Sequence, residues 1–420
     1  MNTAPKTVLH IDIESTIDPA RQRLEVDARL DVPEAIANPG ELSLWLHREL
    51  RIDEVDGPGV ERVTWNADPD NRPSLMPEAA RLDITWSEVG RPTNPVVRVR
   101  CAGHVRSWPE WSANVVTGDW VELGMYLPWF PYSRDHGPFT YDVRFSAPPA
   151  YEVRGLGPAG RTGTTWRFVS TVPTHDIVIA AGRSMLDVRT EGTGFSIAVH
   201  DGTPAPSIAR SIAEDLAWIG STYADQLGPP PIDALRVILS PRPRGGGYAR
   251  QGLLVLGGIE AASYEEHHEA YVRYLGHELA HLWWHRADPS TWEDWLNESF
   301  AEYSALRAVR ARYGNEALDR RLRDKRENLP DLPLWGFERD DRSTDEAIRN
   351  AEALLYRKGP LLLHELAQRL GERPFSAVWR HAAEECIETT AQFLDLLAEH
   401  AGPDVAEQFR ADLQAADLRA

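Results

Sequence analysis

The chain has 420 residues, of which 42% are hydrophobic and 26% charged, a composition typical of a globular protein large enough for two hydrophobic cores. Its formal net charge of -19 at pH 7 argues against nucleic acid or an anionic membrane as a partner, because both are bound by basic surfaces. Two cysteines are too few for a disulfide framework. The sequence shows no apolar leader and no apolar run of membrane-spanning length, so we expect a cytoplasmic protein.

Residues 1–198 alternate apolar and polar side chains over short stretches bounded by Pro, Gly, Asn and Asp. This period of two is typical of strands with one buried face, and no long helical pattern interrupts it. We therefore expect an antiparallel β-sandwich or saddle-shaped sheet domain. The predicted strands are 8–13, 24–30, 42–46, 82–86, 96–101, 141–145, 165–168 and 176–180.

Residues 199–420 are expected to form a second domain, because a stretch rich in Pro and Gly at 199–206 interrupts the alternation. Beyond it, apolar residues recur mostly with the period of an α-helix. The chain thus predicts an α+β multidomain protein, a β domain followed by a mostly helical domain with a small edge sheet. The predicted strands of this domain are 235–239 and 252–256, and the predicted helices are 207–226, 265–286, 291–312, 360–370 and a helical tail at 374–420.

The helix expected over 265–286 contains the pattern His-Glu-x-x-His at His277, Glu278 and His281. Residues four apart lie on one face of a helix, so both imidazoles can hold the same metal ion, as in zinc sites. Glu278 is displaced by about 100° around the helix, so it would act as a general base rather than as a ligand. The same pattern also arises on ordinary amphipathic helices, whose apolar side chains simply pack inward.

Three more residues extend this constellation. A catalytic zinc has three protein ligands, and we assign Glu298, on the next predicted helix, as the third. Glu302 lies one turn later and could accept the second N–H of a ligating histidine, or could be a solvated surface carboxylate. Tyr356 precedes the helix over 360–370 and could donate a hydrogen bond to a developing oxyanion, or could belong to the core or its rim.

These blocks, in this order, resemble the gluzincin aminopeptidase family, which includes membrane alanyl aminopeptidase and leukotriene hydrolase. In that family a His-Glu-x-x-His helix is followed by a Trp-Leu-Asn-Glu segment and later by Tyr-x-Lys-Gly. The corresponding residues here are His277 to His281, Trp295 to Glu298, and Tyr356 to Gly359. The resemblance implies an N-terminal β domain at 1–198 and a thermolysin-like zinc metallopeptidase domain at 199–420.

The resemblance also implies roles for single residues. His277, His281 and Glu298 would bind one Zn²⁺ per chain, Glu278 would activate water, and Tyr356 would stabilise the tetrahedral intermediate. The substrate would be a peptide or an aminoacyl compound, cleaved by a zinc metallopeptidase.

Two features depart from the family pattern. Eighteen residues usually separate the second histidine from the ligand glutamate, whereas sixteen do so here, so the connecting loop is shortened. Aminopeptidases of the family also carry a Gly-x-Met-Glu-Asn strand whose glutamate holds the substrate's free amine. An alignment through Gly252 places Ala249 at that position. Glu260, or Glu265 and Glu266, could replace the missing carboxylate, or could be surface charges.

The large helical C-terminal domain of most relatives has no counterpart, so we expect a more open cleft or one completed by a partner subunit or a second copy of the chain. Three functions remain open. The chain could be an aminopeptidase-like peptidase with an altered amine anchor. It could hydrolyse a specialised biosynthetic peptide or a small metabolite. It could also be a non-catalytic scaffold with the same fold.

Overall fold

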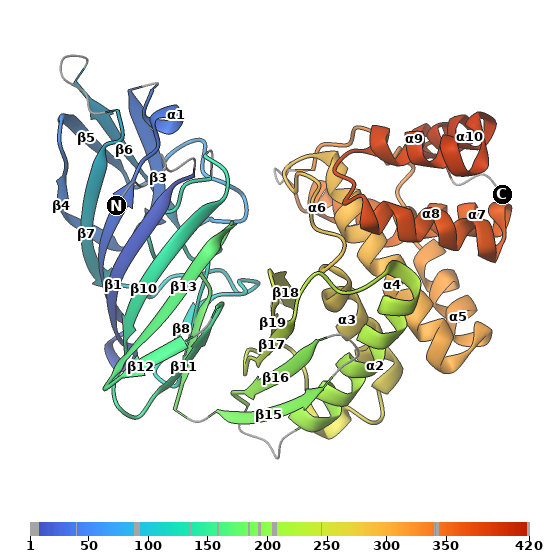
Figure 1. Cartoon of the computed structure of the whole chain (residues 1–420), viewed down its shortest axis with the longest axis horizontal. Coiled ribbons are helices and arrows are strands. Elements are labelled where there is room, and N and C mark those ends of the chain that lie inside the picture. The colour runs from blue at the N-terminus through green and yellow to red at the C-terminus, as the bar shows by residue number, and fades with distance from the viewer. Residues whose placement is uncertain are drawn as a thin grey trace. The chain divides into compact units, whose positions relative to one another are not determined.

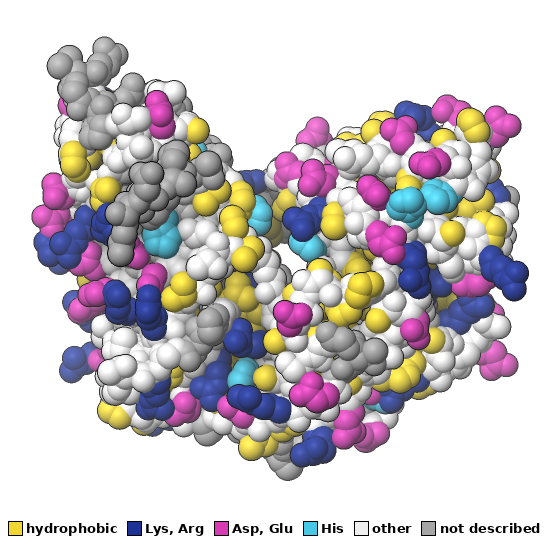
Figure 2. Space-filling view, viewed as in Figure 1, with side chains coloured by type: hydrophobic (Ala, Val, Ile, Leu, Met, Phe, Trp, Pro, Cys, Tyr) yellow, Lys and Arg dark blue, Asp and Glu magenta, His cyan; other side chains and the backbone are white. Residues whose placement is uncertain are grey.

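The computed structural model describes residues 8–417, apart from 39, 88–92, 135, 158, 184, 192–194, 204–207, 245, 340, 342 and 343. The chain forms two compact units (Figure 1). Unit 1 comprises Met1–Leu186, His200–Pro204 and Ile238–Gly258, and unit 2 comprises Asp187–Val199, Ala205–Val237 and Ile259–Ala420. Among the described residues, no helix is both long and apolar enough to cross a membrane. Acidic and basic side chains are interspersed on the face shown in Figure 2.

Unit 1 contains three sheets. The largest has seven strands in the order β12 (Ala159–Thr162), β13 (Thr165–Thr174), β10 (Phe139–Ser146), β1 (His10–Asp18), β2 (Arg23–Asp31), β7 (Val96–His104) and β4 (Leu50–Asp56). A second sheet has the order β3 (Glu41–His47), β6 (Ala79–Trp86) and β5 (Val60–Asn66), and a third has the order β11 (Glu152–Gly155), β14 (Ile179–Gly182), β9 (Trp120–Leu123) and β8 (Val115–Val116). Two short helices, η1 (Pro19–Arg21) and α1 (Glu34–Ala37), lie between strands.

The predicted alternation is confirmed in the large sheet. In β1, Ile11, Ile13, Ser15 and Ile17 are buried, while the residues that alternate with them are at least partly exposed. The expectation of an antiparallel sheet is wrong for one pair, because β1 runs parallel to β10, with Ile11 opposite Tyr141. The sheet is therefore mixed. Alternation reports which face is buried, but it does not fix the direction of a neighbouring strand that lies far away in the sequence.

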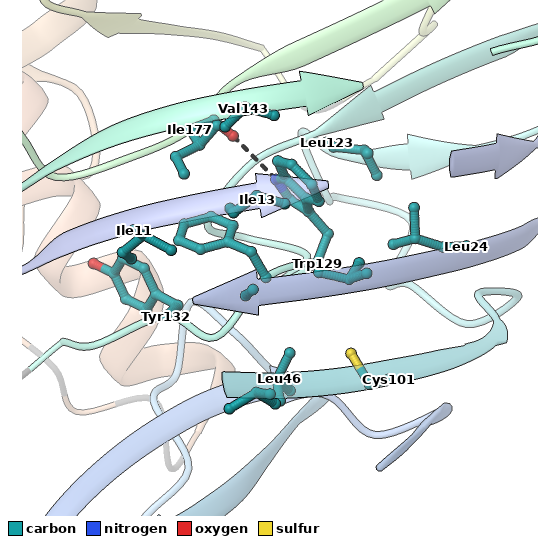
Figure 3. Packing of buried hydrophobic residues seen from close by; sticks show 14 of the residues in the cluster. Ile11, Ile13, Leu24, Leu46, Cys101, Leu123, Trp129, Tyr132, Val143 and Ile177 are labelled. Carbon is teal, nitrogen blue, oxygen red and sulfur yellow. Dashed lines mark hydrogen bonds between the residues drawn. The ribbon is translucent and has the colours of Figure 1, made fainter. Parts of the chain in front are cut away.

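The buried faces of these strands enclose the core of unit 1 (Figure 3). Trp129 lies at its centre, fully buried, and its indole N–H donates to the carbonyl oxygen of Ile177 at 3.1 Å. Phe145 packs edge-on against Trp129, with ring centroids 6.0 Å apart. Burial raises the pKa of the Cys101 thiol to about 12, so this cysteine is an apolar core residue rather than a reactive one.

A further sheet has the strand order β15 (Leu186–Glu191), β16 (Ser196–Asp201), β17 (Ala234–Leu239), β19 (Leu253–Leu256) and β18 (Gly247–Arg250). The edge strand is thus β18, which pairs antiparallel with β19. Gly252, in the tight turn between them, has φ of +85°, a conformation that favours glycine.

Unit 2 is mostly helical, as predicted. Its elements are α2 (Ala209–Leu227), η2 (Ala261–Ser263), α3 (His268–Ala280), η3 (Trp292–Asp294), α4 (Trp295–Tyr313), α5 (Asn315–Arg326), α6 (Asp345–Ala353), the π-helical segment η4 (Leu354–Lys358), α7 (Gly359–Leu370), α8 (Glu372–Glu384), α9 (Thr390–Ala401) and α10 (Pro403–Gln414). Aromatic side chains join α4 to the C-terminal helices: Phe300 stacks on Trp379 of α8, with ring centroids 4.7 Å apart, and meets Phe393 of α9 edge-on at 5.2 Å.

Candidate active site

The two histidines of the His-Glu-x-x-His pattern lie at the end of α3. His277 is in its last turn and His281 caps its C-terminus, so the helix expected to reach residue 286 ends at Ala280. Beyond this point the backbone tightens, because the N–H of Leu282 donates to Leu279 at 3.0 Å, a bond over three residues. His281 keeps helical backbone angles, so the two imidazoles still face the same side, with ring centroids 4.9 Å apart.

Hydrogen bonds fix how each imidazole presents its nitrogens. Nδ1 of His277 lies 3.2 Å from Oε2 of Glu302, and Nδ1 of His281 lies 3.0 Å from the carbonyl oxygen of Trp284. Both partners accept a hydrogen bond from Nδ1, so the Nε2 atom of each imidazole is the nitrogen left to face the other ring. The two Nε2 atoms approach to 3.3 Å. Two nitrogen atoms at this distance are stable with a proton or a metal cation between them, because their lone pairs alone would repel each other.

Glu298 completes the group from the first turn of α4. Its Oε2 lies 3.3 Å from Nε2 of His277 and 3.7 Å from Nε2 of His281, and the three ligand atoms lie within 4.8 Å of one another. Oε2 of Glu298 is buried and faces both imidazoles. In the described part of the chain, these three residues form the one such group of His, Cys, Asp or Glu side chains.

The electrostatics of this group favour a cation. Burial opposes a charge on His277, but the hydrogen bonds and charges of Glu298 and Glu302 outweigh burial and raise its pKa to about 10. Burial also opposes the charge on Glu298, yet the two histidines lower its pKa to about 2. Two imidazole nitrogens and one buried carboxylate oxygen fit Zn²⁺ and would leave its fourth position for water or substrate.

The Trp-Leu-Asn-Glu segment positions Glu298 through Asn297. The Asn297 amide accepts from the N–H of Ala287 at 3.2 Å and donates to its carbonyl oxygen at 3.0 Å, which fixes the loop after α3. It also donates to Oδ1 of Asp294 at 3.0 Å, while Arg339 donates to Oδ2 at 2.8 Å. Burial and the charge of Glu298 raise the pKa of Asp294 to about 6. The loop between α3 and α4 is therefore held by hydrogen bonds at Ala287 and at Asp294.

Glu302 is not a solvated surface carboxylate, because only 1% of its surface is exposed. It accepts from His277 Nδ1, from Arg273 Nη1 at 2.7 Å and from Lys325 Nζ at 2.6 Å. Burial alone would raise its pKa, but Lys325 and Arg273 hold the pKa well below the usual range. Glu302 is thus an ionised carboxylate that orients the imidazole of His277.

Glu278 and Tyr356 lie on neighbouring elements of unit 2. Glu278 is buried on α3, beside His277 in the sequence. Tyr356 lies in η4, and its ring centroid is 5.7 Å from that of His277. Burial, together with the charge of Glu298, raises the pKa of the Tyr356 phenol far above its usual value. Its hydroxyl group therefore stays protonated and can donate a hydrogen bond.

The structure also places the residues considered for substrate binding. Ala249 lies on the edge strand β18 and pairs with Leu254, and Gly252 forms the turn that follows; both belong to unit 1. Glu260 belongs to unit 2 and precedes η2 with an exposed side chain. Glu265 and Glu266 are exposed as well. None of the three described glutamates belongs to the His277, His281 and Glu298 group.

Sequence reasoning missed the residues that surround the ligands. Arg273 stands four residues before His277, so the periodicity of α3 could have placed it on the same face. Asp294 stands four residues before Glu298, just ahead of α4, and gave a similar signal. Lys325 gave no local signal, because it comes from α5 and meets Glu302 only through tertiary packing.

Comparisons with known proteins give the class. Residues 249–410 match the Peptidase family M1 domain. A search of curated proteins found no match. The fold is similar to that of the M1 zinc metallopeptidase from Deinococcus radiodurans, with a TM-score of 0.70 and 20% identity over 98% of this chain and 95% of that one.

Two larger proteins share the fold as well. Leukotriene A4 hydrolase from Saccharomyces cerevisiae gives a TM-score of 0.68 at 17% identity, over 97% of this chain and 68% of that one. An aminopeptidase N family protein from Idiomarina loihiensis gives 0.70 at 14% identity, over 98% and 77%. The chain thus shares the fold of M1 zinc metallopeptidases, and part of it matches a peptidase domain. More specifically, the similarity to the Peptidase family M1 domain includes the segment that contains His277, His281 and Glu298.

Proposed function

We propose that this chain is an aminopeptidase-like zinc peptidase whose metal is held by His277, His281 and Glu298. The observation that carries the proposal is that two imidazole Nε2 atoms and one buried carboxylate oxygen lie within 4.8 Å of one another. A metal cation between these atoms would relieve the repulsion between them. Bound zinc would polarise the scissile carbonyl group and make water more acidic.

The chain's own residues supply the proton transfers. Glu278 accepts a proton from the attacking water and passes it to the nitrogen of the leaving amine. Tyr356 donates a hydrogen bond from its hydroxyl group to the carbonyl oxygen of the substrate as negative charge develops there. The high pKa of this phenol keeps the donor hydrogen in place at neutral pH.

Ala249 bears on the choice of substrate. A methyl group cannot bind the α-ammonium group of a peptide, so selection for a free N-terminus needs another carboxylate. An M1 zinc metallopeptidase mutant from Deinococcus radiodurans was solved with the substrate Tyr-Ser-Ala, which makes short peptides the first substrates to test. The same Ala249 favours a second candidate, the hydrolysis of a specialised biosynthetic peptide or a small metabolite whose amine is absent or blocked.

One experiment tests the proposal. Purified zinc-loaded protein is assayed on aminoacyl reporters and on the same peptides with acetylated N-termini, beside Glu278→Gln. We expect the wild-type protein to cleave and Glu278→Gln to keep its zinc without detectable hydrolysis. Cleavage of free-amine substrates alone supports aminopeptidase action, whereas cleavage of blocked substrates supports the second candidate. A Glu278→Gln variant that retains substantial activity would refute the proposed base.

A further inference from the structure

Tyr356 lies in a helical segment, η4, whose own N–H groups cannot donate a hydrogen bond to every backbone carbonyl oxygen. Pro360 follows Tyr356 by four residues and has no N–H, so the carbonyl oxygen of Tyr356 lacks the donor that an α-helix would supply. The N–H of Gly359 donates to Leu354, five residues earlier, as in a π-helix. The carbonyl oxygen of Leu355 therefore lacks a donor at both the fourth and the fifth following residue.

Two side chains donate hydrogen bonds to these carbonyl oxygens. Ser299, next to Glu298 on α4, donates its hydroxyl hydrogen to the carbonyl oxygen of Leu355 at 2.6 Å. Lys325, from the last turn of α5, donates from Nζ to the carbonyl oxygen of Tyr356 at 2.6 Å. Gly359 permits this close approach, because a Cβ atom there would lie 2.0 Å from Oγ of Ser299. The backbone that carries Tyr356 is thus attached to the helices around the metal ligands.

Lys325 also connects the backbone of Tyr356 to Glu302. Its Nζ also donates to Oε1 of Glu302 at 2.6 Å, and Oε2 of Glu302 holds Nδ1 of His277. One ammonium group therefore joins the carboxylate that orients a metal ligand to the backbone of Tyr356. Only 11% of the Lys325 side chain is exposed, so solvent competes little for these hydrogen bonds.

The choice of lysine at this position is unusual for the chain. Of its 45 basic Lys and Arg residues, three are lysines, at 6, 325 and 358. Lys358 is buried and donates to the carbonyl oxygens of Leu332, Ala415 and Ala416. A compact ammonium group donates in several directions from one point, which the planar fork of arginine does not. Both Lys325 and Lys358 thus donate hydrogen bonds to backbone carbonyl oxygens.

We propose that Lys325 is a positioning residue that sets Tyr356 and His277 relative to each other. The inference rests on the proposed function, because it assumes that the hydroxyl group of Tyr356 meets the substrate beside the metal. Lys325 itself touches neither. Loss of its ammonium group frees the Tyr356 carbonyl oxygen and weakens the hold on Glu302. A catalytic group displaced by about 1 Å can cost on the order of a hundredfold in rate.

The test is a double-mutant cycle between Lys325→Met and Tyr356→Phe, with kcat and KM measured separately on the best substrate of the panel. We expect Lys325→Met to lower kcat by about tenfold or more and to change KM little. In the Tyr356→Phe background the same substitution should change kcat by only about twofold, because the hydroxyl group that it positions is already gone. A lysine that served stability alone would have the same effect in both backgrounds.

Zinc affinity gives a second readout that does not depend on turnover. Competition with a chelator should show weaker zinc binding in Lys325→Met, by about tenfold, and unchanged binding in Tyr356→Phe. Arg273→Met is the matched control, since it removes the other cation bound to Glu302 but has no hydrogen bond to Tyr356. It should weaken zinc binding too, while its effect on kcat stays independent of Tyr356→Phe.

The outcomes separate the two proposals. Equal effects of Lys325→Met in both backgrounds of an active enzyme overturn the inference and leave the proposed function standing. The inference is also overturned, and the proposed function left standing, if the effect of Arg273→Met on kcat depends on Tyr356→Phe as strongly as the effect of Lys325→Met does. If Lys325→Met does not fold by circular dichroism, Lys325→Gln enters the same cycle with the same expectation. If the wild-type protein cleaves no substrate, the proposed function fails and the inference fails with it.

Discussion

Replacing Glu302 by glutamine is the most informative single change near the metal ligands. The glutamine keeps the shape of the side chain and an acceptor oxygen, but it removes the negative charge that Lys325 and Arg273 hold in place. The amide can then meet Nδ1 of His277 with its oxygen only if its nitrogen faces the two cations. One of these contacts must become unfavourable.

The magnitude follows from the burial of the carboxylate. Loss of an outer partner of a ligating histidine costs about 10- to 100-fold in metal affinity, or about 1.4–2.8 kcal/mol. Removal of one partner from a buried ion pair typically costs about 3–5 kcal/mol of stability. We expect the lower end of this range of stability loss, because 35% of the Arg273 side chain is exposed and water can solvate its charge when the ion pair is lost. We therefore expect both weaker zinc binding and a lower midpoint of unfolding.

The assay is a zinc titration against a chelator of known affinity, with thermal unfolding of the metal-free and zinc-loaded proteins. Glu372→Gln is the control, because Glu372 also accepts from two arginines, Arg307 and Arg310, but does not belong to the metal group. Its zinc affinity should equal that of the wild-type protein. Wild-type zinc affinity in Glu302→Gln would refute the idea that this carboxylate orients His277.

Three further predictions follow from particular contacts. Tyr356→Phe should keep one zinc per chain by elemental analysis and lose about 100-fold or more in kcat, and unchanged kcat would remove the phenol from the mechanism. Burial lowers the pKa of His47, whose Nε2–H donates to Ser107 and whose Nδ1 accepts from the N–H of Glu49. Because this pKa is lower in the folded state, the unfolded chain binds the proton more readily, and His47 contributes stability above about pH 6.5 that is lost as the pH falls. Denaturant titrations from pH 7.5 to 5.5 should therefore show a steeper loss in the wild-type protein than in His47→Gln, and parallel curves would contradict this. Phe300→Ala should lower the free energy of unfolding by about 3–5 kcal/mol in urea, because the ring stacks in a buried aromatic cluster, and a loss below 1 kcal/mol would show that the cluster relaxes around the cavity.

The ligand group could be predicted from the sequence because its geometry is largely local. The spacing of His277 and His281 places both imidazoles on one face whether or not the last residue is strictly helical. The segment before Glu298 pointed to this residue as the third member of the group, and the structure places its carboxylate beside both imidazoles. The periodicity did not indicate that α3 ends at Ala280, and the loop after it is held by hydrogen bonds between Asn297 and Ala287, a contact between separate elements.

Other features depended on contacts across larger separations in the sequence. The parallel pairing of β1 with β10 leaves no mark in local alternation, so the sheet was expected to be antiparallel throughout. The π-helical segment around Tyr356 could have been inferred, because a proline four residues later removes a backbone donor. Its partner Lys325 could not, because no pattern connects α5 with that carbonyl oxygen. The boundary near residue 198, a cytoplasmic location and a partner subunit stay predictions.

The most direct test of the central claim is an anomalous difference map, measured at the zinc edge, from a crystal of the zinc-loaded protein. The account predicts one strong peak per chain, within coordination distance of Nε2 of His277, Nε2 of His281 and the carboxylate of Glu298. A map without that peak, or a peak that Glu298 does not reach, would contradict it.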